Sequence, residues 1–478
     1  MSSVLHRKIN RRALLIGSGG FAAAALLPRV ARTAMDSVKD LTLTLTAAPG
    51  RAPLVGASYP STDVWCYGNS IPGPEFRVRQ GEPVRVVVRN QLSEDTTVHL
   101  HGIRLPNAMD GVPGLTQPPI KPGEQFTYEF TPPDAGTFWY HPHADSLQQL
   151  GRGMAGALIV EEPEPIAVDR DILWMLGDWR LTSDAQIARG FGNAMEAGMS
   201  GRVGNTVTLN GRVSEEEPVR AGERVRLRLV NSALARIMAL RFEGHRPVVI
   251  AIDGQPCEPH EPQGGRVFLG PAMRIDVMLD MQSEPGRRYR VIDDFYDGLS
   301  YWLTQLAYDK RPPMRAHPLA APISLPRNPL PEPDLASAER HELRLQGGMM
   351  GGGAMMGMGG MQGMSHGMSW AINGHSMSGD GHAGMPPLLT LQHGRSYVLT
   401  MRNETAWWHP MHLHGYSFRV LSRNGSPVPH RQWADTVLIP PKESVDVTFV
   451  ADNPGDWMLH CHVTDHQVSG MMTVLRVA

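Results

Sequence analysis

The amino-acid sequence predicts an all-β protein made of three β-sandwich domains. Its 478 residues correspond to about three domains of ordinary size. Runs of β-branched and aromatic residues are broken by Gly, Pro and Asn at short intervals, which is typical of sandwiches, and the chain contains 50 Gly and 40 Pro. One set of histidine motifs also occurs near both ends of the chain, which indicates that the first and last domains arose by duplication.

Residues 1–35 read as an export signal. Arg11 and Arg12 precede a mildly apolar stretch, residues 13–27, which is short for a membrane span and diluted by glycine. A twin arginine in this context is typical of proteins exported by the twin-arginine machinery. We therefore expect a periplasmic protein with no stable membrane insertion after cleavage; the alternative is a basic tail on a cytosolic protein.

The net charge bears on the expected partners, and the cysteine content bears on disulfides and metal binding. The formal net charge of −2 gives no reason to expect nucleic acid as a partner. There are three cysteines, at positions 66, 257 and 461. If Cys461 binds a metal, Cys66 and Cys257 could pair, but the default expectation is two buried free thiols.

The first domain, expected over residues 36–165, contains two His-x-His pairs. His99 and His101 follow a predicted strand, and His141 and His143 end the next apolar run. Side chains two apart on a strand share a face. A lone histidine on a strand is more often a core residue than a ligand, but two pairs in one domain favour a metal site.

The second domain, expected over residues 166–310, offers no such pattern. His245 is isolated, and His260 is expected in a Pro-rich loop. We therefore expect a domain without metal ligands that acts as a spacer. A Pro-rich linker over residues 311–337 follows it.

The third domain, expected over residues 338–478, combines two kinds of site. His460 and His462 share a strand face, while Cys461 between them points to the other side. A thiolate together with imidazole and a weak thioether is the ligand set of a copper electron-transfer site. Upstream, another histidine pair is preceded by a histidine of opposite parity that can face Cys461. The full set in this domain is His409, His412, His414, His460, Cys461, His462, His466 and Met471.

The motifs of the first and third domains match one another. Residues 98–102 resemble residues 411–415, and residues 135–143 resemble residues 454–462. Pro142 occupies the place of Cys461, so the first copy cannot build a thiolate site. The eight paired histidines are therefore expected to face each other across one shared metal cluster.

In these motifs the chain resembles the three-domain multicopper oxidases of the bacterial laccase and cuprous-oxidase type, and the resemblance covers essentially the whole mature chain. The resemblance implies three cupredoxin-like Greek-key domains, with the cluster between the first and third. It implies four copper ions, with these ligands: His409, Cys461, His466 and Met471 for type 1; His99 and His412 for type 2; His101, His141 and His462 for one type 3 copper; and His143, His414 and His460 for the other.

The resemblance also implies the chemistry. A reductant near His409 or His466 supplies electrons one at a time, which pass through Cys461 to the cluster and reduce O₂ to water. Asp110 corresponds to the acidic residue that supplies protons in the family; the alternative is an ordinary turn residue. Gln467 stands where some relatives carry a second carboxylate.

Residues 347–385 form a methionine-rich segment with ten of the chain's 27 methionines. Thioethers suit Cu(I), and cuprous oxidases carry such an insert over the type 1 site, so an extra Cu(I) is expected here. The alternative is a low-complexity loop. The chain lacks the acidic and Met residues that such relatives have just before the first type 1 histidine, so a substrate Cu(I) site would need other ligands, such as Glu404.

We therefore expect a periplasmic multicopper oxidase that oxidises Cu(I) for copper tolerance. One alternative is a laccase for phenols or aromatic amines, with the methionine-rich segment as a partial lid. Another is a copper-binding carrier without turnover, although a carrier has no use for the eight cluster histidines. A copper nitrite reductase is excluded because it lacks this histidine set, and structural cell-division homologues have lost the ligands kept here.

Overall fold

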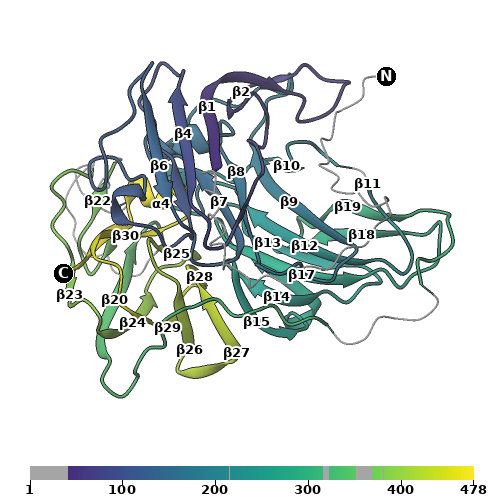
Figure 1. Ribbon diagram of the computed structural model, residues 1–478. Helices are drawn as coiled ribbons and strands as arrows, with labels where there is room; N and C mark the ends of the chain where they lie inside the picture. Colours follow the sequence, from purple (N-terminus) through teal and green to yellow (C-terminus); the bar gives the residue numbers. More distant parts are fainter. Residues whose placement is uncertain (1–40, 215, 316–321, 351–368, 380–381) are drawn as a thin grey trace, which may run out of the picture. The chain divides into compact units, whose positions relative to one another are not determined.

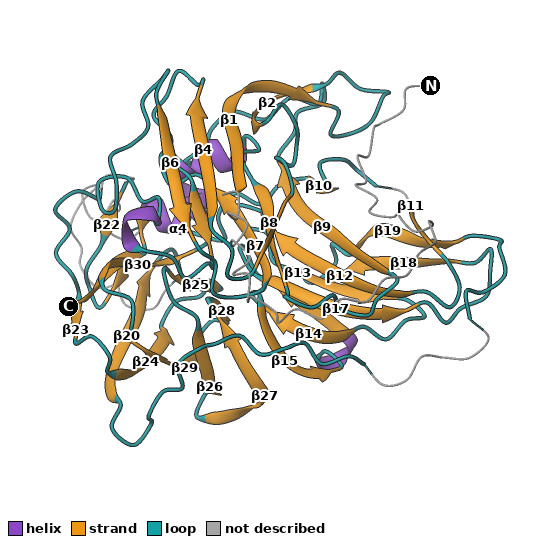
Figure 2. Cartoon of the chain, viewed as in Figure 1, coloured by secondary structure: helices purple, strands orange, loops and turns teal. Residues whose placement is uncertain are grey.

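The computed structural model describes residues 41–478, except residues 215, 316–321, 351–368 and 380–381. Strands form nearly all of its regular structure, and the helices are short (Figures 1 and 2). This confirms the all-β fold class. The expected export signal, residues 1–35, lies outside the described residues.

The first pair of sheets lies within residues 41–161. Strand β4 alternates buried Val84, Val86 and Val88 with the more exposed residues 85, 87 and 89, so one face packs on a core and the other meets solvent. One sheet has the order β2 (Thr62–Tyr67), β1 (Leu41–Ala52), β4 (Val84–Asn90), β6 (Gln125–Phe130). The other has the order β3 (Phe76–Arg79), β8 (Gly156–Glu161), β7 (Gly136–His141), β5 (His99–His101).

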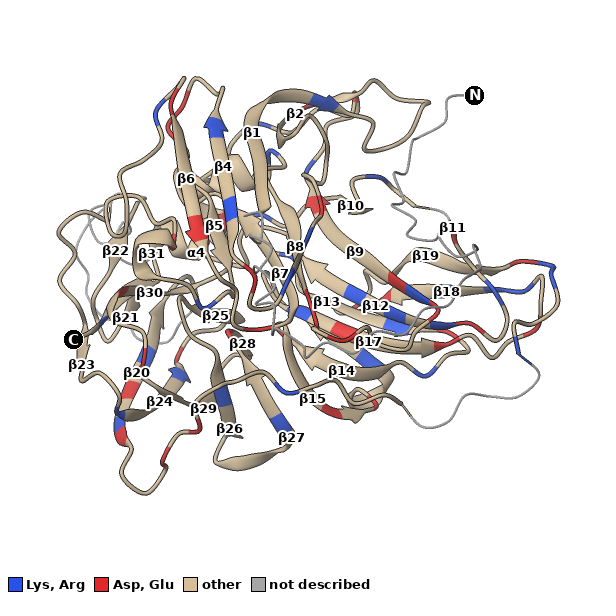
Figure 3. Ribbon diagram, viewed as in Figure 1, with Lys and Arg blue, Asp and Glu red and all other residues tan. Residues whose placement is uncertain are grey.

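The second pair lies within residues 170–308. Its larger sheet has the order β10 (Thr206–Leu209), β9 (Arg170–Trp179), β12 (Arg224–Asn231), β17 (Arg274–Asp280), β14 (Val248–Ile252), β15 (Gln255–His260). Its smaller sheet has the order β11 (Glu216–Val219), β19 (Tyr301–Tyr308), β18 (Arg288–Asp293), β13 (Met238–Phe242), β16 (Arg266–Leu269). Figure 3 shows basic and acidic residues on the neighbouring strands β12 and β17.

His260 corrects one expectation from the sequence. It was expected in a Pro-rich loop, but it is the last residue of β15. The prolines are tolerated because β15 is an edge strand with an irregular register against β14.

The third pair lies within residues 339–477. Its larger sheet has the order β21 (Trp370–Ile372), β20 (Glu339–Gly347), β24 (Ser396–Asn403), β29 (Ser444–Val450), β26 (Phe418–Arg423), β27 (Ser426–Ala434). The other has the order β23 (Leu389–Leu391), β32 (Met472–Val477), β30 (Gly455–Cys461), β25 (His409–Leu413), β28 (Thr436–Ile439). The short strands β22 (Met377–Ser378) and β31 (Ser469–Gly470) pair with each other. Strand boundaries thus fall inside the three expected domains, whose exact limits remain predictions.

Equivalent motifs of the first and third pairs form equivalent strand pairs. On β5 and β7, His99 lies opposite His141. On β25 and β30, His412 lies opposite His460. The same local sequence therefore gives the same pairing in both places, as duplication predicts.

The methionine-rich segment is not a single inserted loop. Strands β21 and β22 lie inside the range 347–385, and Trp370 on β21 is fully buried. Residues 351–368, which carry six of the ten methionines, lie outside the described part of the chain. The segment therefore begins and ends in the third sheet pair.

Three further findings bear on the site. All three cysteines are buried and free, which confirms the expectation for Cys66 and Cys257. The short helices include the 3₁₀ turn η1 (Asn107–Met109), α1 (Ser146–Gly151), α2 (Ala194–Ala197), the 3₁₀ turn η2 (Gln263–Gly265) and α4 (Thr464–Val468). Among the described residues, none of the helices has the length and apolar character needed to cross a membrane.

Candidate metal centres

Eight buried histidines converge between the first and third sheet pairs. They form overlapping groups of three, and within each group the potential ligand atoms lie within 4.8 Å of one another. The stacked rings of His99 and His414, 3.9 Å apart, and of His101 and His412, 3.7 Å apart, bring the two copies face to face. The groups are His99, His101 and His412; His101, His141 and His462; His143, His414 and His460; and His99, His141 and His143.

Several ring nitrogens in this cluster are buried and have no hydrogen-bond partner among the residues that the structure describes. They include Nε2 of His99, Nε2 of His412 and both nitrogens of His143. Buried polar atoms in proteins are normally satisfied. The Nδ1 of His99 lies 2.7 Å from the carbonyl oxygen of Asp110, so its Nε2 is the nitrogen left for a metal. These orphaned nitrogens fit bound copper.

Burial also favours the neutral form of several cluster imidazoles. It lowers the pKa of His141, His143 and His414 well below the ordinary value, and neighbouring histidines lower it further. A neutral imidazole has a free lone pair, whereas imidazolium cannot bind a metal. The copper-free cluster therefore presents ligands in the required protonation state.

Asp110 lies directly against the cluster. It follows η1, it is buried, and its Oδ2 accepts a hydrogen bond from Nδ1 of His414 at 2.9 Å. The next residue, Gly111, has φ +86°, and a Cβ there would stand 2.0 Å from the carbonyl oxygen of Val98. Only glycine therefore allows the turn that brings this carboxylate to the histidines.

The second candidate centre is built around Cys461. The Cys461 Sγ lies 3.4 Å from Nδ1 of His409 and 3.6 Å from Nδ1 of His466. Met471 is buried, and its carbonyl oxygen accepts from the backbone N–H of Cys461 at 3.0 Å. Burial raises the pKa of the Cys461 thiol and lowers that of His466 to about 3. A buried thiol needs a cation to become a thiolate, which copper provides.

The two histidines of this centre do not reach the surface. Both are fully buried. The Nε2 of His409 is 2.8 Å from the Thr405 hydroxyl, and Nε2 of His466 is 2.7 Å from the carbonyl oxygen of Met199. The sequence missed Met199 because it belongs to the second domain, which carries no ligand pattern.

Residues from two other segments cover His466. The Trp370 ring lies 4.2 Å from the His466 ring, and its Nε1 donates to the carbonyl of Ala197. The backbone N–H of Met349 donates to the carbonyl of Gly198. The start of the methionine-rich segment is thus hydrogen-bonded to the loop after α2, and that loop covers His466.

One glutamine and two carboxylates lie around this centre. Gln467, at the place of a second carboxylate, is buried, and its side-chain nitrogen has no partner among the described residues. Two residues earlier, Asp465 is buried and accepts from the backbone N–H of Arg202 at 2.7 Å. Burial raises its pKa to about 6. Glu404 accepts from the Gln346 amide at 2.8 Å, beside the start of the methionine-rich segment.

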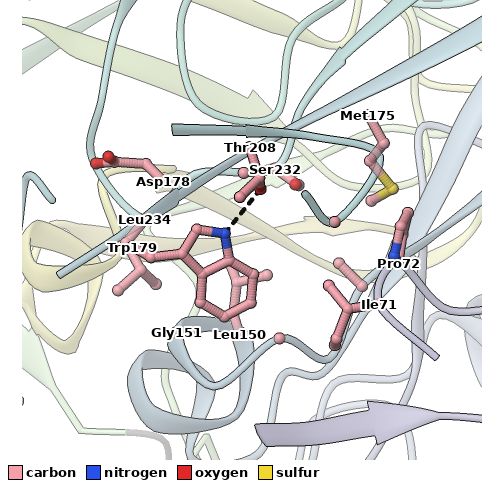
Figure 4. A pocket seen from close by; sticks show the side chains of 14 residues that line it. Ile71, Pro72, Leu150, Gly151, Met175, Asp178, Trp179, Thr208, Ser232 and Leu234 are labelled. Carbon is pink, nitrogen blue, oxygen red and sulfur yellow. Dashed lines mark hydrogen bonds between the residues drawn. The ribbon is translucent and has the colours of Figure 1, made fainter. Parts of the chain in front are cut away.

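Figure 4 shows a small cavity whose lining contains no ligand of either centre. Trp179 and Thr208 line it, and the Trp179 Nε1 donates to the Thr208 hydroxyl at 2.8 Å. Leu150 and Met175 contribute much of the remaining wall. None of the sequence-predicted site residues lines this cavity.

Comparisons with known proteins agree with this arrangement. Three family models described as multicopper oxidase match residues 53–165, 170–299 and 360–478. The multicopper oxidase MmcO of Mycobacterium tuberculosis is 31% identical over 495 residues, which cover 96% of this chain and 91% of that protein.

Solved structures give the same result. A multicopper oxidase from Pseudomonas thermotolerans has a TM-score of 0.80 and 36% identity, covering 92% of this chain and 100% of that one. A Campylobacter jejuni enzyme described as a metallo-oxidase has a TM-score of 0.75 and 25% identity, covering 93% and 92%. The buried histidine cluster, the Cys461 centre and these similarities together place the chain in the multicopper oxidase family, as a copper-dependent oxidoreductase.

Proposed function

We propose that the protein is a periplasmic cuprous oxidase, which couples oxidation of Cu(I) to reduction of O₂ to water and so contributes to copper tolerance. The observation that carries the proposal is the cover over His466. Met199 and Met349 contribute backbone groups to it, and Met195, four residues before Met199 on α2, is 61% exposed. Thioethers are preferred ligands of Cu(I), and within the described part of the chain neither histidine ring of the Cys461 centre has an exposed edge to offer a phenol.

The proposal assigns copper as the family resemblance implies. When bound, copper supplies one-electron redox chemistry at the Cys461 centre and O₂ binding at the cluster. The assignment takes four ions, with the type 1 ligands His409, Cys461, His466 and Met471, the type 2 ligands His99 and His412, and the type 3 ligands His101, His141, His462, His143, His414 and His460.

The chain's own residues then have distinct tasks. Cys461 is bonded through the backbone to His460 and His462, so a short covalent path joins the two centres. Asp110 holds Nδ1 of His414 and is the buried carboxyl placed to move protons to the cluster. Burial of all eight cluster histidines excludes bulk water.

Export by the twin-arginine machinery is part of the proposal and rests on Arg11 and Arg12. A periplasmic location would place the enzyme where excess Cu(I) can be oxidised outside the cytoplasm. An extra Cu(I) bound by residues 347–385 would feed the cover over His466.

A laccase that oxidises phenols or aromatic amines is the second candidate. It draws support from Laccase-1 of Botryotinia fuckeliana, which is 28% identical over 87% of this chain. A carrier without turnover is disfavoured, because the buried cluster histidines and Asp110 serve O₂ reduction and not storage.

The test is O₂ consumption by the copper-loaded protein with Cu(I) or with 2,6-dimethoxyphenol as sole reductant. Deleting residues 347–385 would remove β21 and Trp370, which packs on His466, so the variant should lack residues 351–368 only. A double variant, Met195→Leu with Met199→Leu, tests the cover, and Met278→Leu on buried β17 is the matched control.

A cuprous oxidase is expected to lose Cu(I)-driven O₂ consumption by about 10-fold or more in both test variants, as for loss of metal-binding groups, while phenol oxidation stays equal or rises. Poor Cu(I) turnover with strong phenol oxidation, indifferent to the deletion, would make the protein a laccase. No O₂ uptake with either donor would leave the carrier.

A further inference from the structure

Two charged residues of the second sheet pair lie fully buried beside the histidine cluster. Arg274 begins β17, and Asp253 follows β14. The Nη1 and Nη2 groups of Arg274 donate to the two carboxylate oxygens of Asp435, at 2.8 and 2.5 Å. Asp253 accepts from the backbone N–H of Arg274 at 2.9 Å and from that of Thr436 at 3.0 Å. The second sheet pair is therefore hydrogen-bonded to the third at this point.

Asp435 in turn contacts two cluster histidines. Its Oδ1 lies 3.1 Å from Nε2 of His101, and its backbone oxygen lies 2.9 Å from Nδ1 of His412. Because these nitrogens are occupied, the opposite nitrogen of each ring is left for metal. Nδ1 of His101 lies 3.4 Å from Nε2 of His141, and Nε2 of His412 has no hydrogen-bond partner within the described part of the chain. Asp435 thus fixes which nitrogen each ring presents.

The first domain makes room for this contact. Gly102 follows His101 with φ +87°, and a Cβ there would stand 2.3 Å from Nη2 of Arg274 and 2.4 Å from Oδ2 of Asp435. The Nε of Arg274 donates to the carbonyl of Thr137 on β7 at 3.2 Å. All three sheet pairs therefore meet at one guanidinium.

A purely structural role would explain the pair poorly. Replacing a buried ion pair by apolar residues is often neutral or stabilising, so burial of three charges does not by itself favour folding. Arg226, on neighbouring β12, shows what a structural pair looks like here, because it is equally buried and bonds Asp276 and Glu162 without touching a histidine. The two-point contact of Arg274 differs because its acceptor, Asp435, also contacts two histidines of the cluster.

We propose that Arg274 and Asp253 are positioning residues of the second domain, which hold Asp435 so that His101 and His412 present the correct nitrogens to copper. The inference rests on the proposed copper assignment, since His412 is a type 2 ligand and His101 a type 3 ligand in it. The second domain then takes part in building the cluster and is more than a spacer.

The test compares Arg274→Gln and Asp253→Asn with the control Arg226→Gln, all in the copper-loaded full chain. Arg274→Gln removes the two-point contact with Asp435. Asp253→Asn places an amide N–H₂ against one of the backbone N–H groups that Asp253 now accepts from, and it removes the charge 3.4 Å from Nη1 of Arg274, so the support of Asp435 is weakened while the Arg274 guanidinium itself is kept. Copper per chain, the type 2 EPR signal and melting temperature are measured, with the type 1 blue absorption as internal standard.

In both test variants the type 2 EPR signal should change its hyperfine splitting or disappear, and the affinity for that copper should fall about 10- to 100-fold. The type 1 absorption should persist. Arg226→Gln should lower the melting temperature yet keep the wild-type type 2 signal. Arg274→Lys, which keeps the charge but not the fork, should restore the signal only in part.

The proposal fails if Arg274→Gln and Asp253→Asn keep the type 2 signal and copper content of Arg226→Gln. If Arg274→Gln does not fold, Asp253→Asn alone decides by the same criterion. A wild-type protein with a type 1 band but no type 2 signal would instead overturn the copper assignment, so the two failures are distinguishable.

Discussion

Cys461 illustrates how single residues define the two centres. Its thiol faces His409 and His466, while its chain neighbours His460 and His462 belong to the cluster. The alternation of side chains along a strand accounts for this division without any long-range information. Strand alternation alone therefore predicts which of these residues belong to each of the two centres.

Replacing Cys461 by serine should abolish the blue type 1 absorption and all turnover, because a hydroxyl does not replace a thiolate as a copper ligand. The cluster histidines should still bind copper, so about one copper per chain should be lost. Absorption spectra and copper analysis measure both. Cys66→Ser is the control, since Cys66 is a buried free thiol that donates to the carbonyl of Ala48 and belongs to neither centre; unchanged blue colour in Cys461→Ser would contradict the assignment.

Replacing Asp110 by asparagine should slow O₂ reduction about 100-fold, the usual scale for losing a proton-transfer group. The amide oxygen can still accept from His414, so copper content should hold. Steady-state O₂ consumption is the measurement. Asp134→Asn is the control, because Asp134 is equally buried but bonds Arg104; equal slowing in both variants would reduce Asp110 to a structural residue.

At the scale of elements, short loops decide where functional groups stand. The η1 turn and Gly111 bring Asp110 to the cluster, and the loop after α2 covers His466. Such loops are held by a few close backbone contacts, so their geometry depends on individual glycines.

Gly111→Ala should therefore destabilise the protein by more than the about 1–2 kcal/mol expected for a left-handed non-glycine residue, because its Cβ would meet the Val98 carbonyl at 2.0 Å. Gly123→Ala is the matched control, with φ +81° and no atom within 4 Å. Urea unfolding of both variants gives the difference. Equal losses would show that the Asp110 turn tolerates a side chain.

At the scale of the whole molecule, the cluster is an interface between sheet pairs. The first and third pairs supply its histidines, and the apolar core of the third continues to Trp139 of the first and Val230 of the second. Packing of the first sheet pair on the third therefore also brings the candidate copper ligands together. The free energy of unfolding should depend on the protonation of the buried histidines.

The copper-free protein should lose stability as the pH falls below about 6.5, the ordinary histidine pKa. Above that pH the imidazoles are neutral in both the folded and unfolded states. Below it the unfolded chain takes up protons that the folded protein refuses, because burial keeps the pKa of the site histidines low, about 3 for His466. Each such histidine costs about 1.4 kcal/mol per pH unit.

Urea unfolding at pH 7.5, 6.0 and 5.0 measures this slope. Copper-loaded protein is the control, since bound metal excludes protons from the same nitrogens until it dissociates. A copper-free protein equally stable at pH 7.5 and 5.0 would mean that the histidines are not buried as neutral groups.

The sequence by itself determined the fold class and where the candidate ligands lie. Strand alternation separates Cys461 from His460 and His462, and the repeated motifs indicate that two copies face each other. These signals are local or periodic, so they survive without a structure. The family resemblance supplied the assignment of each histidine to a copper and the role of Asp110.

Only the tertiary structure decided what surrounds those ligands. The Met199 carbonyl over His466 and the Arg274 contact with Asp435 join single residues from distant segments. Such residues carry no spacing pattern, because nothing in a strand's period encodes which remote loop packs on it. For this reason the sequence of the second domain shows no site pattern, although one of its loops contacts His466 and its buried Arg274 contacts Asp435 beside the cluster.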